Sequence, residues 1–453
     1  MSGSSGEFSK AADFRIDELT LKSSSGSTFI DFQKIVFGLR FESSIFTNNM
    51  VGSLLVTDTS NLPLNMPLLG QDFLTVKLST PTINQPIIDN VLCVSEMTNR
   101  EDLSQGAQAY RLVLDSPETL LSNRVRIKNS FTDTTSSIVE NIIRGKLKST
   151  KELTIQKTTG VRKFVSPNLR PMDFIKNLTR ESISSKGSPH YVFFESTRGY
   201  HFVSTDYMYS LPIRAKLIPS EPSLIKHGNR DLDTEIDNII EYNTSISPST
   251  LYLTRCGMLS SKLTVYNIFE KSYEVYDYDY FRDFDTQSRT GENPIYLESP
   301  IDDEENTIST FPDANINLHP TSKSGQSDKR YSGSFSDNQS EKWLLKRRSK
   351  ILEHSMGKSI QVMIHGRTDL AVGDMVHVTL PVTGKTHGKD EYDPFLSGKY
   401  LITDLEHIFS IADDNMSHSI TMNLSQDGVD KSFEIVGNSV QPKKGDSVTN
   451  NVE

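Results

Sequence analysis

The 453-residue sequence contains little cysteine and no long apolar segment. Its two cysteines, Cys93 and Cys256, each lie inside an apparent β-strand. This placement indicates two buried thiols rather than a disulfide or a metal-binding pair. No run approaches the roughly 20 apolar residues that a membrane-spanning helix needs, so no membrane segment is predicted. The N-terminus lacks the basic start and the apolar stretch of a secretory signal, and synthesis and folding in a cytoplasm are expected.

The sequence also lacks an excess of basic residues and the spacings of common catalytic motifs. With 58 acidic and 48 basic residues the net charge is -10, which argues against a surface that neutralises nucleic-acid phosphates. An acidic wall would instead let a DNA duplex slide past without sticking. The ten histidines contain no pair at helical metal-ligand spacing, and neither a nucleophile elbow nor a phosphate-binding glycine loop occurs. We therefore expect no catalytic, metal or cofactor site and no enzyme activity.

Three groups of polar residues deserve an interpretation of their own. The first is a set of histidines on or beside strands, interpreted as polar positions that face solvent or a subunit interface: His365, His377, His407 and His418. The second is the run 274–285, in which alternation predicts a strand with tyrosines on one face and aspartates on the other, rather than a calcium or glycosidase site. The third is the basic group Lys346, Arg347, Arg348 and Lys350, interpreted as a solvated helix face or a contact to an acidic partner.

The most informative feature present is a pattern that occurs twice. Each copy combines a Gly/Asp turn with a strand of alternating apolar residues, and two further strands follow in the same order. The matching segments are 70–78 with 372–380, 93–97 with 401–405, and 110–114 with 420–424. The matching turn and strand positions are Gly70, Asp72, Leu74 and Val76 in the first copy and Gly373, Asp374, Val376 and Val378 in the second. A duplicated antiparallel β-barrel is therefore predicted.

The chain is too long for one ordinary hydrophobic core, so several domains are expected. The predicted fold is mainly β and of the α+β class, with two similar antiparallel β-barrels and a small mixed α/β domain between them. The expected parts are a flexible arm at 1–12, the first barrel at 13–117, the mixed domain at 118–230, the second barrel with associated helices at 231–285 and 343–430, a polar insertion loop at 286–342, and a flexible tail at 431–453.

Local patterns predict four helices and several strands. In 133–143, cap-type residues precede an apolar stripe, with Ser137 and Glu140 at capping-box spacing. Pro171 suits the first turn of a helix over 171–180. A third helix is predicted over 231–242, with Ile236, Ile239 and Ile240 facing inward, and a fourth over 341–356. The segments 250–254 and 260–266 are expected to be strands of the second barrel, and 191–203 is expected to be a hairpin.

Four stretches of the chain, taken in order, carry a family resemblance. They are 52–58 with 64–74, 165–175, 257–267, and 373–381 with 397–402. Together they resemble the central baseplate-hub protein of T-even-type contractile phage tails, a family related to the hub part of type VI secretion spike proteins.

The resemblance implies two tube-type barrels in each subunit of a homotrimer, which would form a pseudo-six-fold ring. Such a ring would adapt a six-fold tail tube to a three-fold cell-puncturing spike and leave a lumen for DNA. The implied partners are tail-tube or tube-initiator proteins and the spike protein. The implied location is the tail baseplate of the virion, after assembly in the host cytoplasm. We further expect the lumen-facing positions to be neutral or acidic.

Two alternatives of other classes remain open at this point. One is a tail-associated enzyme that degrades the cell wall, which would need paired carboxylates or a nucleophile and base in one pocket. The other is a monomeric β-barrel adhesin or carbohydrate-binding module. A hydrolysis assay would separate the first from a hub, and the mass in solution would separate the second.

Overall fold

The computed structural model describes most of the chain. The described residues are 11–23, 29–65, 68, 70–80, 88–103, 106–219, 236–246, 249–267, 271–321, 340–382, 392–412 and 415–431. The expected tail therefore lies outside them from residue 432 onward, as do residues 1–10 of the expected arm and 322–339 of the expected insertion loop. None of the helices in these stretches is long and apolar enough to cross a membrane.

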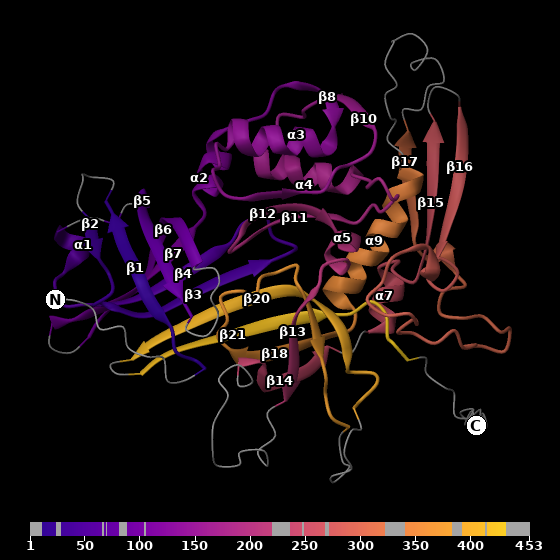
Figure 1. Ribbon diagram of the computed structural model, residues 1–453. Coiled ribbons are helices and arrows are strands. Elements are labelled where there is room, and N and C mark those ends of the chain that lie inside the picture. Colours follow the sequence, from indigo (N-terminus) through magenta and orange to yellow (C-terminus); the bar gives the residue numbers. More distant parts are fainter. Residues whose placement is uncertain are drawn as a thin grey trace, which may run out of the picture.

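Thirteen strands form one sheet that runs through much of the molecule (Figure 1). In spatial order they are β19 (Met375–Val378), β13 (Ile213–Pro219), β14 (Asn238–Ile246), β18 (Ser359–His365), β21 (Asn415–Ser425), β20 (Gly398–Ala412), β3 (Val36–Ser44), β4 (Val51–Asp58), β7 (Gln108–Asp115), β6 (Ile88–Asp102), β5 (Asp72–Ser79), β1 (Arg15–Lys22) and β2 (Phe29–Asp31). Because β19 also pairs with β20, the first six strands of this order close into a β-barrel. The prediction of a mainly β protein of the α+β class is confirmed.

Of the two predicted β-barrels, the described residues show one that closes into a ring, the second copy. In the second copy, β13 is parallel to both β14 and β19, and these pairings complete the ring. In the first copy, β1 pairs with β5 and with the three-residue strand β2, and the described residues provide no pair that closes a second ring. Within its described residues, the first copy is therefore a sheet without ring closure. Strand β13 was expected in the mixed domain, but its buried Ala215 and Leu217 belong to the barrel core.

Alternation of apolar and polar residues gives each copy its own core. In β5 every second residue is buried, and Leu74, Val76 and Leu78 have no exposed surface. They pack in a cluster made by the strands of the first copy, whereas Val376 and Val378 pack in the separate core of the barrel. Burying such a side chain stabilises the fold by roughly 1.5–3 kcal/mol. Each copy is therefore stabilised mainly by its own hydrophobic core.

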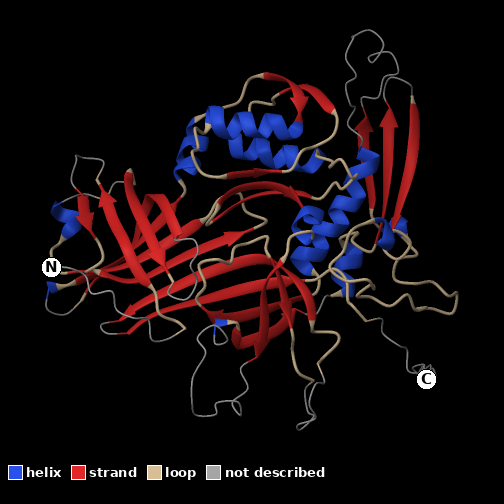
Figure 2. Cartoon of the chain, in the orientation of Figure 1, coloured by secondary structure: helices blue, strands red, loops and turns tan. Residues whose placement is uncertain are grey.

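A mixed α/β layer covers the sheet where the two copies meet (Figures 1 and 2). Its elements are α2 (Pro117–Arg124), β8 (Ser130–Thr134), α3 (Thr135–Asn141), η2 (Ile142–Lys146), β9 (Leu153–Ile155), β10 (Val161–Val165), α4 (Pro171–Glu181), β11 (Tyr191–Ser196), β12 (Gly199–Ser204) and α5 (Thr205–Tyr209). All six residues of β11 are buried, because Val192 and Phe194 face the barrel core while Tyr191 and Phe193 face the helices. The predicted hairpin and both predicted helices of this layer are present. Helix α3 begins differently, since Thr134 is its N-cap and accepts from the backbone N–H of Ser137.

A third unit has a sheet of its own. Its elements are α7 (Thr250–Arg255), β15 (Ser260–Asn267), β16 (Ser272–Asp279), η4 (Phe284–Thr286), η5 (Pro312–Ala314), β17 (Ile316–Thr321) and α9 (Ser340–Met356); the short α1 (Leu62–Asn65) lies in the first copy. Strand β15 pairs with β16 and β17, and residues of β15 and β16 pack in a hydrophobic core separate from the barrel core. The expected placement of 260–266 in the second barrel is therefore wrong. The stretch 286–321 is also more than a loop, because it supplies β17 and the buried residues Ile295 and Tyr296.

Two secondary-structure predictions are wrong because short apolar runs fit either period. The expected helix over 231–242 is replaced, within the described residues, by the start of β14, which buries Ile239 and exposes half of Ile240. The expected strand over 250–254 is the helix α7, whose N-cap Ser249 accepts from the backbone N–H of Tyr252. Cys256 consequently follows a helix and is half-buried, whereas Cys93 is buried in β6 as predicted.

Candidate functional site: the repeated sheets and the strand that joins them

The two copies of the repeat share five strands in the same spatial order. The order β3-β4-β7-β6-β5 of the first copy matches β14-β18-β21-β20-β19 of the second, and every neighbouring pair is antiparallel. The sixth strand differs, because β1 is antiparallel to β5 whereas β13 is parallel to β19. The sequence repeat therefore corresponds to a five-stranded unit, to which each copy adds a different strand.

Both copies carry a β-bulge at the same place. The register of β6 against β7 shifts at Ser95, and the register of β20 against β21 shifts at Thr403. Each hydroxyl donates to a backbone carbonyl of the neighbouring strand, Ser95 to Val113 at 3.3 Å and Thr403 to Asn423 at 3.1 Å. Bulges bend a strand and increase its twist. Sequence analysis missed them, and their only signal is a small hydroxyl residue at the same position of both copies.

Strand β20 joins the two copies by changing its partner at this bulge. Residues 398–401 of β20 pair with β19 of the barrel, whereas residues 404–410 pair with β3 of the first copy. At the changeover, the backbone N–H of Ile45 donates to the Thr403 carbonyl at 2.9 Å. Strand β21 follows β20 on its other side from Leu401 to Ala412. One long hairpin therefore makes a continuous sheet of both copies, and we call this region the joint.

The eight predicted turn and strand positions form two separate sets. Gly70 and Gly373 both have a positive φ, 78° and 87°, in the region that favours glycine. A Cβ added to Gly70 would lie 2.8 Å from the Ser95 carbonyl oxygen, and one added to Gly373 would lie 2.9 Å from the Phe194 ring. Both are turn positions that a larger residue would strain. The set in β5 and the set in β19 lie in different cores, so the eight residues do not converge on one pocket.

The two aspartates of the repeat are both buried. Asp374 binds Arg198 from the turn between β11 and β12, with Nη1 to Oδ1 at 2.8 Å and Nη2 to Oδ2 at 2.6 Å. It also accepts from the backbone N–H of Ala371 at 3.1 Å. Burial alone would lower the pKa of Arg198, but its bonds and charge interaction with Asp374 raise that pKa. Asp374 thus fixes the mixed layer to the barrel, while Asp72 occupies the matching strand start in the first copy.

A histidine pair lies inside the joint. His407 on β20 and His418 on β21 have their Nδ1 and Nε2 atoms 3.1 Å apart, and both side chains are buried. The His418 ring stacks on Phe409, with ring centroids 4.0 Å apart. Burial lowers the pKa of His407 to about 3, and burial together with His407 lowers the pKa of His418 well below its ordinary value. The expectation that these two residues face solvent or an interface is wrong, because the strands that carry them have a core on this side.

The other two histidines are half-buried, His365 on β18 and His377 on β19. Burial also lowers the pKa of His377. Among the residues that the structure describes, no group of three or more His, Cys, Asp or Glu side chains could hold a metal ion.

The outer face of the joint is acidic. A shallow hollow of about 140 Å³ there is lined by Glu42 from β3, Asp404 and Glu406 from β20, and polar residues of β18 and β21. Glu42 lies directly opposite Glu406 in the β3–β20 pair, where like charges are unfavourable. Arg40 offsets part of this repulsion, with Nη1 3.4 Å from Oε1 of Glu406. Acidic residues are thus concentrated on the sheet face where the two copies meet.

The tyrosine and aspartate run forms the predicted strand only as far as Asp279, after which the chain turns into the short helix η4. In β16 and the turn after it, Tyr278 and Tyr280 are buried while Asp277 is exposed. The basic group on α9 does not form one solvated face, since Lys350 is buried and Arg348 donates to Asn315, just before β17, and to Asn317 within it. The reason is that α9 packs between the three-stranded sheet and the mixed layer, so several of its faces are covered.

Lys350 belongs to a buried network of charged residues. Its Nζ lies 2.5 Å from Oδ2 of Asp427, and both side chains have no exposed surface. The second ion pair of the network joins Arg289 and Glu353, with Nη1 and Oε2 2.6 Å apart. Tyr280 donates to Glu353 at 3.1 Å. The network ties α9, the end of the barrel and the stretch after η4 to one another.

Asp427 is the centre of this network. Its Oδ1 accepts from the backbone N–H and the hydroxyl of Thr290 at 2.7 and 2.8 Å, and its Oδ2 accepts from Tyr209 at 2.8 Å. Burial alone would raise its pKa, but the charges of Lys350 and Arg289 hold that pKa well below its ordinary value. Asp427 therefore stays ionised while fully buried. Its partners are far from it in sequence, which is why sequence analysis missed the network.

Comparisons with known proteins identify the fold. No family model and no curated protein matches the sequence. Among solved structures, a tail protein from Neisseria meningitidis has a TM-score of 0.51 and 11% identity, over 91% of this chain and 97% of that one. The 43 kDa tail protein of prophage MuSo2 from Shewanella oneidensis has a TM-score of 0.50 and 11% identity, over 90% and 98%. The chain has the fold of these tail proteins.

A component of the Escherichia coli type VI secretion system is also similar, with a TM-score of 0.42, 12% identity and coverage of 93% of this chain and 79% of that one. Through the two tail proteins, the predicted resemblance to phage tail proteins is confirmed at the level of the fold. The tail-protein likeness spans the barrel, the first copy and the mixed layer together, since it covers nine tenths of the chain.

Proposed function

We propose that this protein is the structural hub of a phage-type tail baseplate, in which three copies form a ring around a central lumen. The joint carries the proposal, because β20 makes two copies of a five-stranded unit into one continuous sheet. Three such chains around one axis would present six related units. That number suits an adaptor between a six-fold tail tube and a three-fold spike. The fold shared with tail proteins supports the same reading.

In this proposal the protein acts without catalysis. The tube or tube-initiator proteins would bind one side of the ring and the cell-puncturing spike the other, and DNA would pass through the lumen once the spike has left. The assembled ring would lie in the virion tail after assembly in the host cytoplasm. A cell-wall-degrading enzyme is the main alternative, and a peptidoglycan hydrolysis assay on purified protein would detect it.

The mass of the purified protein in solution tests the ring. We expect a species about three times the 50.9 kDa mass of one chain, measured by light scattering or native mass spectrometry. Images of that species by electron microscopy should show a closed ring with a central opening. A stable monomer at micromolar concentration would contradict the trimer and favour the adhesin alternative.

The acidic outer face of the joint suits the wall of such a lumen. DNA would pass along a wall that repels phosphates, whereas a basic wall would bind them. We expect the unchanged protein to show no measurable affinity for a DNA duplex. A triple variant with Glu42→Lys, Asp404→Lys and Glu406→Lys should bind the duplex, and its affinity should fall by roughly tenfold or more between 50 and 200 mM salt. Fluorescence anisotropy of a labelled duplex measures both quantities.

The matched control makes the same change of charge elsewhere. Asp303, Glu304 and Glu305 are exposed and lie away from the joint, in the stretch before β17. The triple variant with lysine at these three positions should bind DNA much more weakly than the joint variant, because its charges would not line the lumen. Equal binding by the two variants would mean that net charge alone is responsible and would count against a lumen at the joint.

A further inference from the structure

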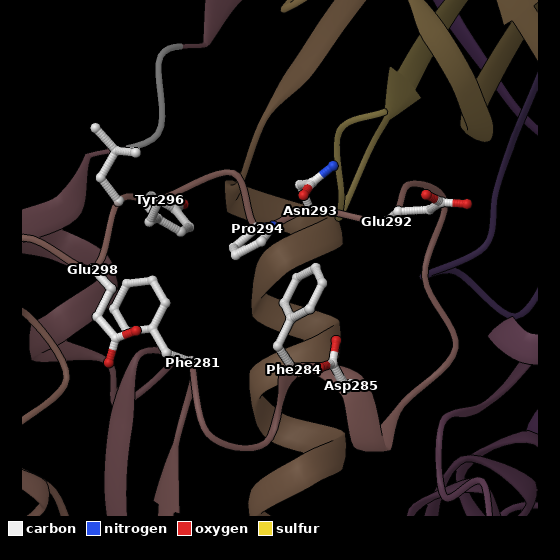
Figure 3. A pocket seen from close by; sticks show the side chains of 9 residues that line it. Phe281, Phe284, Asp285, Glu292, Asn293, Pro294, Tyr296 and Glu298 are labelled. Atoms are coloured by element: carbon white, nitrogen blue, oxygen red, sulfur yellow. The ribbon is translucent and has the colours of Figure 1, made fainter. Parts of the chain in front are cut away.

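A pocket of about 350 Å³ lies beside the three-stranded sheet, away from the joint (Figure 3). Phe281 lines it from the turn after β16, Phe284 and Asp285 line it from η4, and residues of the stretch 292–298 form its opposite side. Figure 3 shows the rings of Phe281 and Phe284 on either side of the opening, with Pro294 between them. The volume is at the small end of ligand pockets, so it suits a side chain or a fragment rather than a large ligand.

Packing behind the pocket holds its aromatic wall in place. Tyr280 has no exposed surface and meets Phe281, Phe284 and Tyr296 edge to face, with ring centroids 5.3, 5.7 and 5.4 Å away. Edge-to-face pairs of this kind stabilise a fixed arrangement of rings. The same cluster already holds one cation on its inner side, since the Arg289 guanidinium lies 4.1 Å from the Phe284 ring centroid. The wall is therefore formed before any ligand enters.

The rim of the pocket is negatively charged. The carboxylate of Glu298 lies beside Phe281 and that of Asp285 beside Phe284, and Glu292 is a third acidic residue of the lining (Figure 3). All three are exposed, and in the part of the chain that the structure describes none of them forms an ion pair. Aromatic faces and carboxylates both attract cations, and together they discriminate against neutral or anionic groups.

We infer that this pocket binds an arginine or lysine side chain of a partner protein. The positive end would lie between the rings and within reach of Asp285 and Glu298, while the methylene stem would cover the apolar wall. Leu297 at the rim is 43% exposed and Ile301 beyond it is 60% exposed, so apolar neighbours of the basic residue would also find contacts. A short basic-apolar segment is the partner chemistry that fits. This inference does not depend on the proposed trimer or on its lumen.

N-acetyl-arginine amide is the probe that tests the inference, in ligand-observed NMR titrations at low salt. We expect saturable binding with a Kd on the order of 1 mM, as is usual for a ligand of this size. The citrulline analogue has nearly the same shape without the charge and should bind at least about tenfold more weakly. A similar affinity for both compounds, or no saturable binding of the arginine compound, would overturn the inference.

Substitutions test whether N-acetyl-arginine amide binds in this pocket. The double variant Asp285→Asn and Glu298→Gln should raise the Kd about tenfold. Both side chains are exposed, so neither substitution should affect folding. The control Asp303→Asn and Glu304→Gln makes the same change of charge outside the pocket and should leave the Kd within about twofold. Phe281→Leu should raise the Kd about fivefold by removing one ring face. Equal losses in the control and the pocket variant would place the binding elsewhere.

A second probe separates a protein side chain from a free polyamine, which carries the same ammonium chemistry. The Kd of spermidine should be lower than that of N-acetyl-arginine amide only by the amount that its additional positive charges explain. Phe281→Leu should change the Kd of spermidine little. Binding of spermidine without any binding of the arginine compound would overturn the assignment to a protein partner.

Discussion

Replacing Asp427 by alanine is expected to lower the free energy of unfolding by about 3–5 kcal/mol, the usual cost of removing one partner from a buried ion pair. The variant would leave the Lys350 ammonium without its 2.5 Å partner and deprive the Thr290 N–H and hydroxyl of their acceptor. Neither group can reach water, because Lys350 and Thr290 are buried. The midpoint and slope of urea unfolding measure the change.

A control substitution and a double variant test whether the loss of unfolding free energy comes from breaking the buried ion pair or from removing any carboxylate. Asp430 is an exposed carboxylate three residues further along, and Asp430→Ala should change stability by less than about 0.5 kcal/mol. Lys350→Met should cost much less in the Asp427→Ala protein than in the unchanged one, because the uncompensated charge is then gone. A loss below about 1 kcal/mol for Asp427→Ala would show that the network is open to solvent and does not hold the parts together.

Features of this fold that depend on nearby residues can be predicted from the sequence. Alternation identified Leu74, Val76, Val376 and Val378 as strand residues, since every second residue of a half-buried strand faces the core. Pro171 marked the start of α4 for a reason that is local to the first helical turn. Features that depend on neighbours within a few residues were therefore accessible.

Features that depend on distant partners were not. Lys350 belongs to a basic group on α9 and would be solvated on an isolated helix, but its partner Asp427 is 77 positions away. The third unit is another example, because β17 joins β15 across a polar stretch that carries little strand pattern. The closure of the barrel is a third, since the parallel pairing of β13 with β19 joins segments that no local pattern relates. The candidate site at the joint was therefore predicted only as a repeat, without the bulge or the changeover of β20.

Acid is expected to unfold this protein well before its carboxylates titrate. Burial lowers the pKa of His190, His201 and His354 to about 4 each and that of His407 to about 3, and it also lowers the pKa of His418. In the unfolded chain each histidine has a pKa of about 6.5. Above about pH 7.5 both states are neutral and these groups contribute no pH dependence. As the pH falls from 6.5 toward 4, the unfolded chain binds protons that the folded protein does not, so stability decreases.

The size of the effect follows from the number of protons. One such histidine removes about 1.5 kcal/mol between pH 6.5 and pH 5, so His190, His201, His354 and His407 together would remove about 6 kcal/mol, which is comparable to the whole stability of an ordinary domain. We expect the urea midpoint to be nearly constant from pH 8 to 7 and to fall steeply below pH 6.5, with unfolding near pH 5. The slope of the unfolding free energy against pH should correspond to several protons.

A single substitution tests whether the buried histidines cause this slope. Gln in place of His407 can keep a polar contact to His418 but cannot take up a proton in the unfolded chain. His407→Gln should therefore reduce the proton uptake on unfolding by about one between pH 4.5 and 6, even if it also lowers stability at pH 7. Because a purely structural loss shifts the whole curve without changing its slope, the slope is the decisive measurement. A variant with an unchanged slope, or a protein whose stability is constant down to pH 4.5, would mean that His407 is protonated in the folded joint.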